Sequence, residues 1–308
     1  MVNYIIEKVR YQSEDTTIAA LQYIPEAIEK CPAIIMAHGF GLTKEAYIDK
    51  FAERFAQSGF VVILFDYRNF GESEGTPRQE INPFMQIDDY KNSVTYACNL
   101  SNVDSNRIGI WGTSYSGGHV IVTAATDKRV HCVVTQVPTI SGYHSALRRM
   151  TSEKIPAYLE MIKKDRQLRF SGENPLTKSL VGPTDENPIY PAEDARRFYT
   201  LAHSLSPSFI NHVTVRSMEY SRMYEPGTYV AQISPTPILF IVALVDTVTP
   251  TDLCLRAYQE CLPPKHLITI SSGHFSPYTD HFETASKGAL QWFNRHLNAN
   301  TDLGLYTD

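Results

Sequence analysis

Short, almost uninterrupted apolar runs alternate along this chain with longer segments whose apolar residues recur at helical spacing. Residues 4–11 and 17–24 flank the polar turn SEDTT and predict an antiparallel hairpin. Further runs, rich in Val and Ile, are typical of strands buried on both faces of a parallel sheet. They cover residues 33–39, 60–66, 107–112, 130–137, 237–246 and 266–274.

The segments between these runs predict helices. Residues 83–100 follow Asn82, a favourable N-cap, and place Pro83 at the first helical position. Thr249 is expected to cap another helix at 251–261. Two more helices are predicted at 44–58 and 281–297. Alternation of this kind predicts an α/β fold with a doubly wound, mostly parallel sheet and right-handed crossovers.

Residues 140–235 interrupt the alternation. They carry no strand signal, and their patterns predict only helices, at 143–150, 153–168, 192–204 and 211–224. Such an insertion is either a decoration of the surface or a helical cap over the carboxyl edge of the sheet, where open α/β folds bind ligands. The cap is the favoured interpretation, and it leaves residues 1–139 and 236–308 as the α/β core.

Composition excludes several function classes. The 308 residues carry a net charge of −5 with acids and bases interspersed, so no basic face for nucleic acid is expected. The five cysteines are scattered and form no C-x-x-C pair, which favours a reducing compartment. No apolar run resembles a signal peptide or is long enough to span a bilayer, so a soluble, cytoplasmic protein without membrane contact is expected.

The sharpest chemical signal is the segment RIGIWGTSYSGGHVIV. A buried strand is expected to end at Trp111, Gly112 follows, and Ser114 lies at the tip before a glycine-rich helix start. This layout predicts a nucleophile elbow, whose tight turn needs small residues two positions before and after the serine. Gly112 meets the first requirement, whereas Ser116 replaces the usual glycine at the second. A serine N-cap at an ordinary strand–helix turn is the alternative.

Two backbone N–H groups are expected to stabilise an oxyanion beside this serine. Tyr115, directly after the nucleophile, supplies the first. Phe40, in the loop His38-Gly39-Phe40-Gly41 after an earlier strand, supplies the second. His38 itself is predicted to hold the loop by hydrogen bonds rather than to act in catalysis.

The general base is predicted at His274, on the loop after the last strand, and the orienting acid at Asp246, which ends the preceding strand. Asp252 is close to Asp246 but belongs to the first turn of a helix. Asp66 precedes the serine, the wrong order for the usual triad, and is expected to fix its own turn. Arg68 either belongs to that turn or meets an anion on the substrate.

Six segments together resemble a known group of enzymes: HGFG, FDYRNFGESEG, DSNRIGIWGTSYSGG, NHVTVRSMEY, ISPTPILFIVALVD and GHFSPY. They are similar to the polyketide transferase and thiohydrolase family of α/β-hydrolases, found mainly in fungal secondary-metabolite pathways and akin to dienelactone-hydrolase-like proteins. The similarity covers residues 15 to 298, and NHVTVRSMEY and GHFSPY are its most selective part. The resemblance implies an α/β-hydrolase fold and the triad Ser114, Asp246 and His274. It also implies release of a polyketide acyl chain from a carrier-protein thioester to water or to an alcohol.

The predicted reaction proceeds through an acyl-serine and needs neither a cofactor nor a metal. Plausible pocket walls are the tyrosines Tyr47, Tyr143, Tyr220 and Tyr224. Two alternatives stay open: the same triad could cleave a C–C bond or close a ring, or the fold could bind a ligand without turnover. Docking of an acyl carrier protein and formation of a homodimer also stay open.

Overall fold

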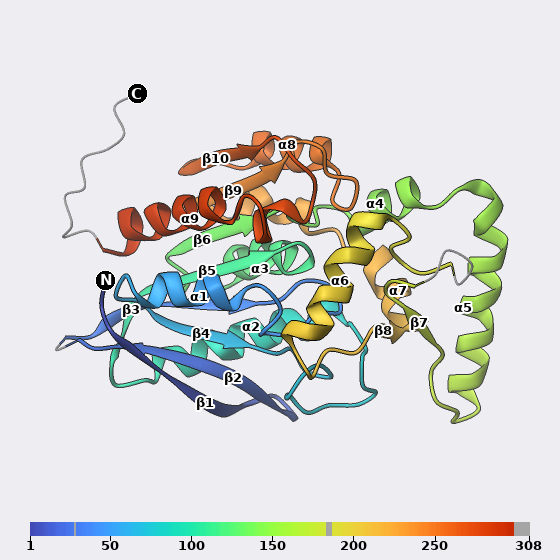
Figure 1. Ribbon diagram of the computed structural model, residues 1–308, viewed down its shortest axis with the longest axis horizontal. Helices are drawn as coiled ribbons and strands as arrows, with labels where there is room; N and C mark the ends of the chain where they lie inside the picture. The colour runs from blue at the N-terminus through green and yellow to red at the C-terminus, as the bar shows by residue number, and fades with distance from the viewer. Residues whose placement is uncertain (28, 183–186, 299–308) are drawn as a thin grey trace.

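The computed structural model describes residues 1–27, 29–182 and 187–298 (Figure 1). Within them, one eight-stranded sheet has the strand order β1-β2-β4-β3-β5-β6-β9-β10. The hairpin β1–β2 is antiparallel and β2 runs antiparallel to β4, whereas the pairs from β4 to β10 are parallel. The strands are β1 (Tyr4–Ser13), β2 (Thr16–Pro25), β3 (Cys31–Ala37), β4 (Val61–Phe65), β5 (Val103–Thr113), β6 (Cys132–Gln136), β9 (Ile238–Ala243) and β10 (Lys265–Ile270).

Helices cover both faces of this sheet, as Figure 1 shows. One face carries α1 (Asp49–Ala56) and α9 (Phe282–Leu297), and the other carries α2 (Pro83–Cys98), α3 (Tyr115–Thr126) and α8 (Thr251–Glu260). Short 3₁₀ turns lie at η3 (Pro226–Gln232) and η4 (Ser276–Tyr278). The prediction of a doubly wound, mostly parallel sheet is therefore confirmed.

The central strands are mostly apolar because both of their faces are covered, although β6 ends in the buried polar residues Thr135 and Gln136. Every residue of β3, β4, β6 and β9 is buried. This continuous burial explains why the strands appear in the sequence as nearly continuous apolar runs rather than as alternating patterns. The predicted N-cap of α2 is also confirmed, since the Asn82 side chain accepts hydrogen bonds from the N–H groups of Phe84 and Met85.

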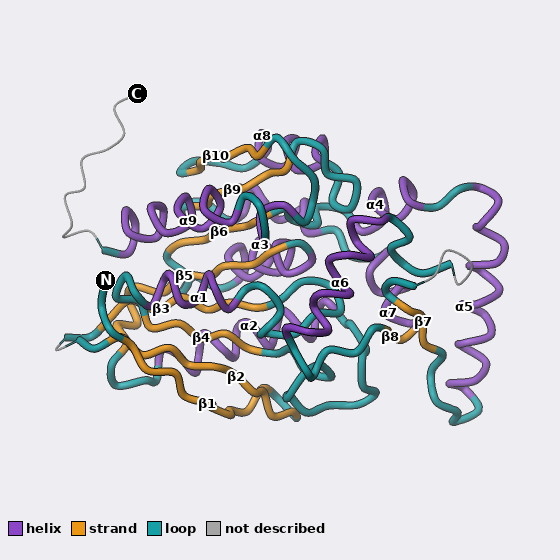
Figure 2. Tube along the Cα trace, in the orientation of Figure 1, coloured by secondary structure: helices purple, strands orange, loops and turns teal. Residues whose placement is uncertain are grey.

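Residues 140–235, which we call the cap segment, place α4 to α7, β7 and β8 at one end of the large sheet (Figures 1 and 2), whereas η3 packs against α3 and α8. Its helices are α4 (Gly142–Arg149), η1 (Ser152–Lys154), α5 (Ile155–Phe170), α6 (Glu193–Leu205) and α7 (Val215–Arg222), followed by η3. Residues 183–186 of the cap segment, and residues 299–308 of the predicted core, lie outside the described part of the chain.

The expectation that the cap segment lacks strands is wrong. β7 (Thr177–Ser179) and β8 (His212–Thr214) pair as a two-stranded antiparallel sheet. Each strand has only three residues, too few to produce a visible alternation in the sequence. The helix expected at 211–224 accordingly begins only at Val215, where Thr214 caps it by accepting a hydrogen bond from the N–H of Ser217.

All five cysteines are free. Among the helices that the structure describes, none combines the length and the apolar character that crossing a bilayer would require.

Candidate active site

Ser114 occupies the sharp turn between β5 and α3. Its backbone has φ 57° and ψ −116°, a conformation that a residue with a side chain rarely adopts. The turn closes because Gly112 lacks a side chain: a Cβ atom there would lie 2.3 Å from the carbonyl oxygen of Ser116. The N–H of Ser114 donates to the carbonyl of Gln136 at 2.8 Å, and its carbonyl accepts from the N–H of Thr139 at 2.8 Å. The elbow predicted from the sequence is thus formed.

Ser116, the departure from the usual glycine, is fully buried. Its hydroxyl lies 2.7 Å from the hydroxyl of Tyr67 and 3.1 Å from that of Tyr90. These two tyrosines satisfy the hydrogen-bonding capacity that a buried serine would otherwise leave unmet. The larger residue is therefore accommodated, and its hydroxyl is bound in the core rather than facing the cavity.

Three side chains from distant parts of the chain meet at this turn. His274 Nε2 lies 3.0 Å from the hydroxyl of Ser114, and His274 Nδ1 lies 2.7 Å from Asp246 Oδ2. The other carboxylate oxygen of Asp246 accepts the N–H groups of Val248 and Thr249, both at 2.8 Å. This arrangement suits a neutral imidazole that donates from Nδ1 to the carboxylate and accepts the serine proton at Nε2.

Thr249 contributes to this group in a way that the sequence prediction missed. Its hydroxyl lies 2.9 Å from Asp246 Oδ2, 2.9 Å from the carbonyl of Val137 and 3.1 Å from His274 Nδ1. The prediction that Thr249 caps α8 is wrong, because the residue before that helix is Pro250 and no side chain caps it. The only signal in the sequence was a threonine three positions after Asp246, and a threonine at that place also suits a helix cap.

The loop that follows β3 lies directly against the serine. A Cβ atom on Gly39 would lie 3.3 Å from Ser114 Cβ, so only a glycine permits this approach without displacement. The next residue, Phe40, and the first residue of α3, Tyr115, both line the same cavity as Ser114. Tyr115 has a free N–H because the first N–H groups of a helix have no intrahelical acceptor. No described residue accepts a hydrogen bond from the N–H of Phe40.

His38 supports this loop from within the core. Its Nδ1 lies 2.9 Å from the carbonyl of Gly39, and its Nε2 lies 3.4 Å from the N–H of Tyr67. Burial lowers the pKa of His38, although the nearby Asp66 opposes this effect. A neutral ring that donates to Gly39 and accepts from Tyr67 matches the structural role predicted for it.

Asp66 fixes the turn that follows β4, as expected. Its carboxylate accepts a hydrogen bond from the Lys44 ammonium at 2.8 Å and another from the N–H of Glu72 at 3.0 Å. Arg68 belongs to the same region of the core: it is buried and lies 2.8 Å from Asp89. The alternative in which Arg68 meets a substrate anion is therefore wrong, because its guanidinium is already paired away from the cavity.

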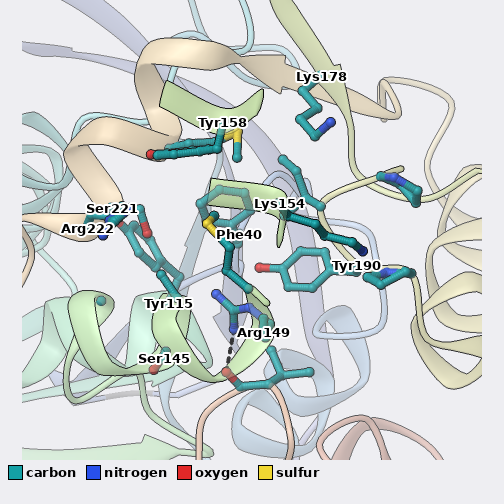
Figure 3. A pocket seen from close by; sticks show the side chains of 18 of the residues that line it. Phe40, Tyr115, Ser145, Arg149, Lys154, Tyr158, Lys178, Tyr190, Ser221 and Arg222 are labelled. Atoms are coloured by element: carbon teal, nitrogen blue, oxygen red, sulfur yellow. Dashed lines mark hydrogen bonds between the residues drawn. The ribbon is translucent and has the colours of Figure 1, made fainter. Parts of the chain in front are cut away.

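A cavity of about 290 Å³ lies between the core and the cap segment (Figure 3), and Ser114 is one of the residues that line it. The core contributes Ser114, Phe40, Tyr115, Val248 and Thr249 to its wall. Much of the remaining wall is apolar and comes from the cap segment: Met150, Ala157, Tyr158, Met161, Ile189, Tyr190, Pro191 and Met218. The cap segment also supplies the basic side chains Arg149, Lys154, Lys178 and Arg222.

None of the four tyrosines expected as pocket walls is among these lining residues, although the structure describes all four. Tyr47 is buried and stacks on Phe198 with ring centroids 4.2 Å apart. Tyr143 is 46% exposed on α4, and Tyr224 is buried against His119, with 2.8 Å between hydroxyl and Nδ1. The Tyr220 ring lies 5.6 Å from the guanidinium of Arg216. Helical periodicity does not reveal which face of a cap helix meets the cavity, so the sequence could not separate these tyrosines from Tyr158 and Tyr190.

No group of three or more His, Cys, Asp or Glu side chains in the described residues is arranged to hold a metal ion.

The fold and the serine elbow define the protein as an α/β-hydrolase, an enzyme of the hydrolase class. The chain belongs to the family described as X-Pro dipeptidyl-peptidase (S15 family), which it matches over residues 14–276.

The chain is also similar to individual proteins with other names. The quorum-quenching protein AidA of Acinetobacter baumannii is 33% identical over 93% of this chain and 94% of its own length. The thiohydrolase aneE of Aspergillus aculeatus is 32% identical over 85% of both chains. The crystal structure of the α/β-hydrolase GrgF from a Penicillium species superposes with a TM-score of 0.83 at 26% identity, over 96% of this chain and 99% of that one. The resemblance to α/β-hydrolases of the thiohydrolase and polyketide transferase group, stated from the sequence, is confirmed.

Proposed function

We propose that the protein cleaves a thioester or ester of an acyl chain through an acyl-serine and passes the acyl group to water or to an alcohol. The observation that carries this proposal is the continuous hydrogen-bonded line from the Ser114 hydroxyl through the His274 ring to Asp246, at 3.0 and 2.7 Å. Ser114 is the nucleophile, His274 the general base and acid, and Asp246 the group that orients the ring.

The reaction has two halves. His274 Nε2 takes the proton of Ser114 as the oxygen attacks the carbonyl carbon, and the N–H groups of Phe40 and Tyr115 donate to the oxyanion that forms. His274 then gives its proton to the departing thiol or alcohol, which leaves the acyl group on Ser114. In the second half, His274 deprotonates an incoming water or alcohol, which attacks the acyl-serine and restores the free hydroxyl.

The acyl chain of the substrate is assigned to the cavity beneath the cap segment. We propose that the cap segment acts as a lid whose methionines and tyrosines cover an apolar chain, because such side chains fit irregular apolar shapes. Relatives named thiohydrolase, acyltransferase and polyketide transferase support acyl chemistry, and a polyketide is the favoured chain. An acyl carrier protein is the proposed donor of that chain.

Mass spectrometry of the intact protein tests the proposal. The protein is incubated with a fluorophosphonate and, separately, with short and long acyl thioesters, and an adduct on Ser114 is expected in both cases. Ser114→Ala should carry no adduct. Ser116→Ala is the matched control, since the Ser116 hydroxyl is bound to Tyr67 and Tyr90 in the core, and this variant should still be labelled.

The same experiment separates the alternatives. No adduct on the wild-type protein, together with binding of acyl ligands, would make the fold a binding module and refute the proposal. An adduct followed by a cyclic product, or by a product shortened at a C–C bond, would keep Ser114 as nucleophile but replace hydrolysis and transfer with another reaction.

A further inference from the structure

Four basic side chains of the cap segment converge from different elements on the cavity that Ser114 lines. Arg149 ends α4, Lys154 ends η1, Lys178 lies in β7 and Arg222 ends α7. No Asp or Glu is among the lining residues that the structure describes. We propose that these four groups bind an anionic group, a carboxylate or a phosphate, on the acyl substrate or on its thiol carrier. This inference rests on the proposed function, because it names the class of substrate for the same site.

The arginines of the cap segment divide into two sets. Arg148, Arg166, Arg169, Arg196, Arg197 and Arg216 each form an ion pair with an acidic side chain. Arg149 and Arg222 form none with any described residue, and these are the two that line the cavity. Among the arginines of the cap segment, the two without an acidic partner are thus the two at the cavity wall. This distribution indicates that their partner is an anionic ligand, because a partly buried guanidinium is stabilised by a charge-assisted hydrogen bond to an anion.

Both unpaired guanidinium groups are held in place by neutral contacts. Arg149 donates to the carbonyl of Val248 at 2.6 Å and lies 5.5 Å from the centre of the Tyr190 ring. Arg222 lies 5.3 Å from the centre of the Tyr158 ring. Figure 3 shows Arg222 across the cavity from Lys154, Lys178 and Tyr190. These contacts fix the positions of the two guanidinium groups without neutralising their charges. The arginine side chains therefore lose little conformational entropy when an anion binds.

The positive charges of Lys154 and Lys178 repel each other. Burial lowers the pKa of the Lys178 ammonium, and the charge of Lys154 lowers it further. An anion placed between them would remove this repulsion. The apolar wall and the basic groups together describe a substrate with an apolar chain and one charged end.

Two sources could supply such an anion, and paired substrates distinguish them. In the first pair, an acyl N-acetylcysteamine thioester carries either a terminal carboxylate or its methyl ester. In the second pair, one neutral acyl chain is presented on pantetheine or on 4′-phosphopantetheine. We expect kcat/KM to be at least about tenfold higher for the charged member of one pair, and this preference should shrink as ionic strength rises. The pair that responds identifies the source.

The double variant Lys154→Gln/Lys178→Gln tests the assignment to these side chains. Both lysines are at least partly exposed, so the fold should tolerate the change. The ratio of kcat/KM between the charged and neutral members should fall about tenfold. The matched control is Arg148→Gln on α4, next to Arg149 in sequence but paired with Asp252, which should keep the wild-type ratio. An equal ratio in the wild type and the double variant, or no preference in either substrate pair, overturns the inference.

Failure of this inference differs from failure of the proposed function. Turnover of neutral thioesters with an adduct on Ser114, but without any charge preference, refutes only the anion site. If Ser114 forms no adduct, calorimetric binding of the carboxylate-bearing acid to the Ser114→Ala protein still tests the anion site. Binding at least about tenfold weaker in Ser114→Ala/Lys154→Gln/Lys178→Gln supports that site, and equal binding refutes it.

Discussion

Ser114 is held in a backbone conformation that its own side chain disfavours. Two hydrogen bonds from flanking segments, to Gln136 and from Thr139, and the missing side chain of Gly112 maintain it. The sequence predicted this elbow because the spacing of glycine and serine after a buried strand is local information. It could not predict how Ser116 would be tolerated, since the partners Tyr67 and Tyr90 come from other elements.

Gly112→Ala should disrupt the elbow. The new methyl group would lie 2.3 Å from the carbonyl oxygen of Ser116, a backbone atom that cannot move freely. We expect a loss of stability of about 1–3 kcal/mol, the usual cost of overpacking, and loss of labelling at Ser114. Urea unfolding and fluorophosphonate labelling measure the two effects. Gly273→Ala is the control, because its nearest neighbour outside the adjacent residues would be 3.8 Å away. Equal stability of the two variants would contradict this reading of the turn.

Thr249 is expected to act as a positioning residue. Thr249→Val removes the hydroxyl beside Asp246 and His274 while keeping the shape of the side chain. A hydrogen bond to a charged group contributes about 1.5–3 kcal/mol, so kcat should fall roughly 10- to 100-fold. The profile of kcat against pH should also shift, because the ring loses one of its neighbours. Thr249→Ser, which restores the hydroxyl, should recover most of the activity. A merely structural role would leave the pH profile unchanged.

At the scale of elements, the sequence predicted the strands of the large sheet better than the cap segment. β3, β4, β6 and β9 are buried throughout, so their apolar runs carry the signal directly. β7 and β8 are three residues long and exist only because they pair with each other. The basic residues on the cavity wall were missed for a similar reason. A charge on a short helix looks the same in the sequence whether it meets an acid or a cavity.

A buried histidine joins three elements of the fold. His119 on α3 lies 2.9 Å from Gln86 Oε1 on α2 and 2.8 Å from the hydroxyl of Tyr224, which follows α7. Gln86 Oε1 can only accept, so the ring donates from Nε2 and accepts from Tyr224 at Nδ1. Protonation would place two donors against each other at Nδ1 and a charge in the core. Burial accordingly lowers the pKa of His119 to about 3.

This histidine predicts a loss of stability in mild acid. Between pH 6.5 and about 3 the unfolded chain binds a proton at residue 119 that the folded protein does not bind. The contribution of the neutral His119 ring to the free energy of unfolding is therefore complete above pH 6.5. It falls as the pH is lowered, by up to about 1.4 kcal/mol per pH unit. His119→Gln keeps one donor and one acceptor and should reduce this slope by about one proton. Urea unfolding at several pH values measures it. His203→Gln, at an exposed site on α6, should keep the slope; a reduced slope there would refute the assignment.

At the scale of the whole molecule, the family name and the cavity point to different substrates. A dipeptidyl-peptidase must accept a free amino terminus, which is a cation. The described wall of the cavity offers that group four basic side chains and no carboxylate. Membership of the S15 family therefore establishes the fold and the hydrolase class, while the charges of the cavity favour an acyl substrate without an ammonium group.

A dipeptide substrate with a free amino terminus should thus be cleaved with a low kcat/KM. We expect kcat/KM for glycyl-prolyl p-nitroanilide to be at least about 100-fold below that for its N-succinyl derivative, in which a carboxylate replaces the ammonium, since like charges brought together cost several kcal/mol. Release of p-nitroaniline measures both rates. Faster cleavage of the unblocked substrate would contradict the charge argument and would favour peptidase action.

The groups that we propose to react and the groups that we assign to recognition come from different stretches of the chain. Ser114, Asp246 and His274 follow strands of the large sheet, whereas all four basic groups of the cavity belong to residues 140–235. Evolution could therefore replace one continuous insertion and change what the enzyme accepts, while the bond-breaking apparatus stays intact. Grafting the corresponding insertion of a relative onto this scaffold would be a direct route to an enzyme that accepts a different substrate but performs the same reaction.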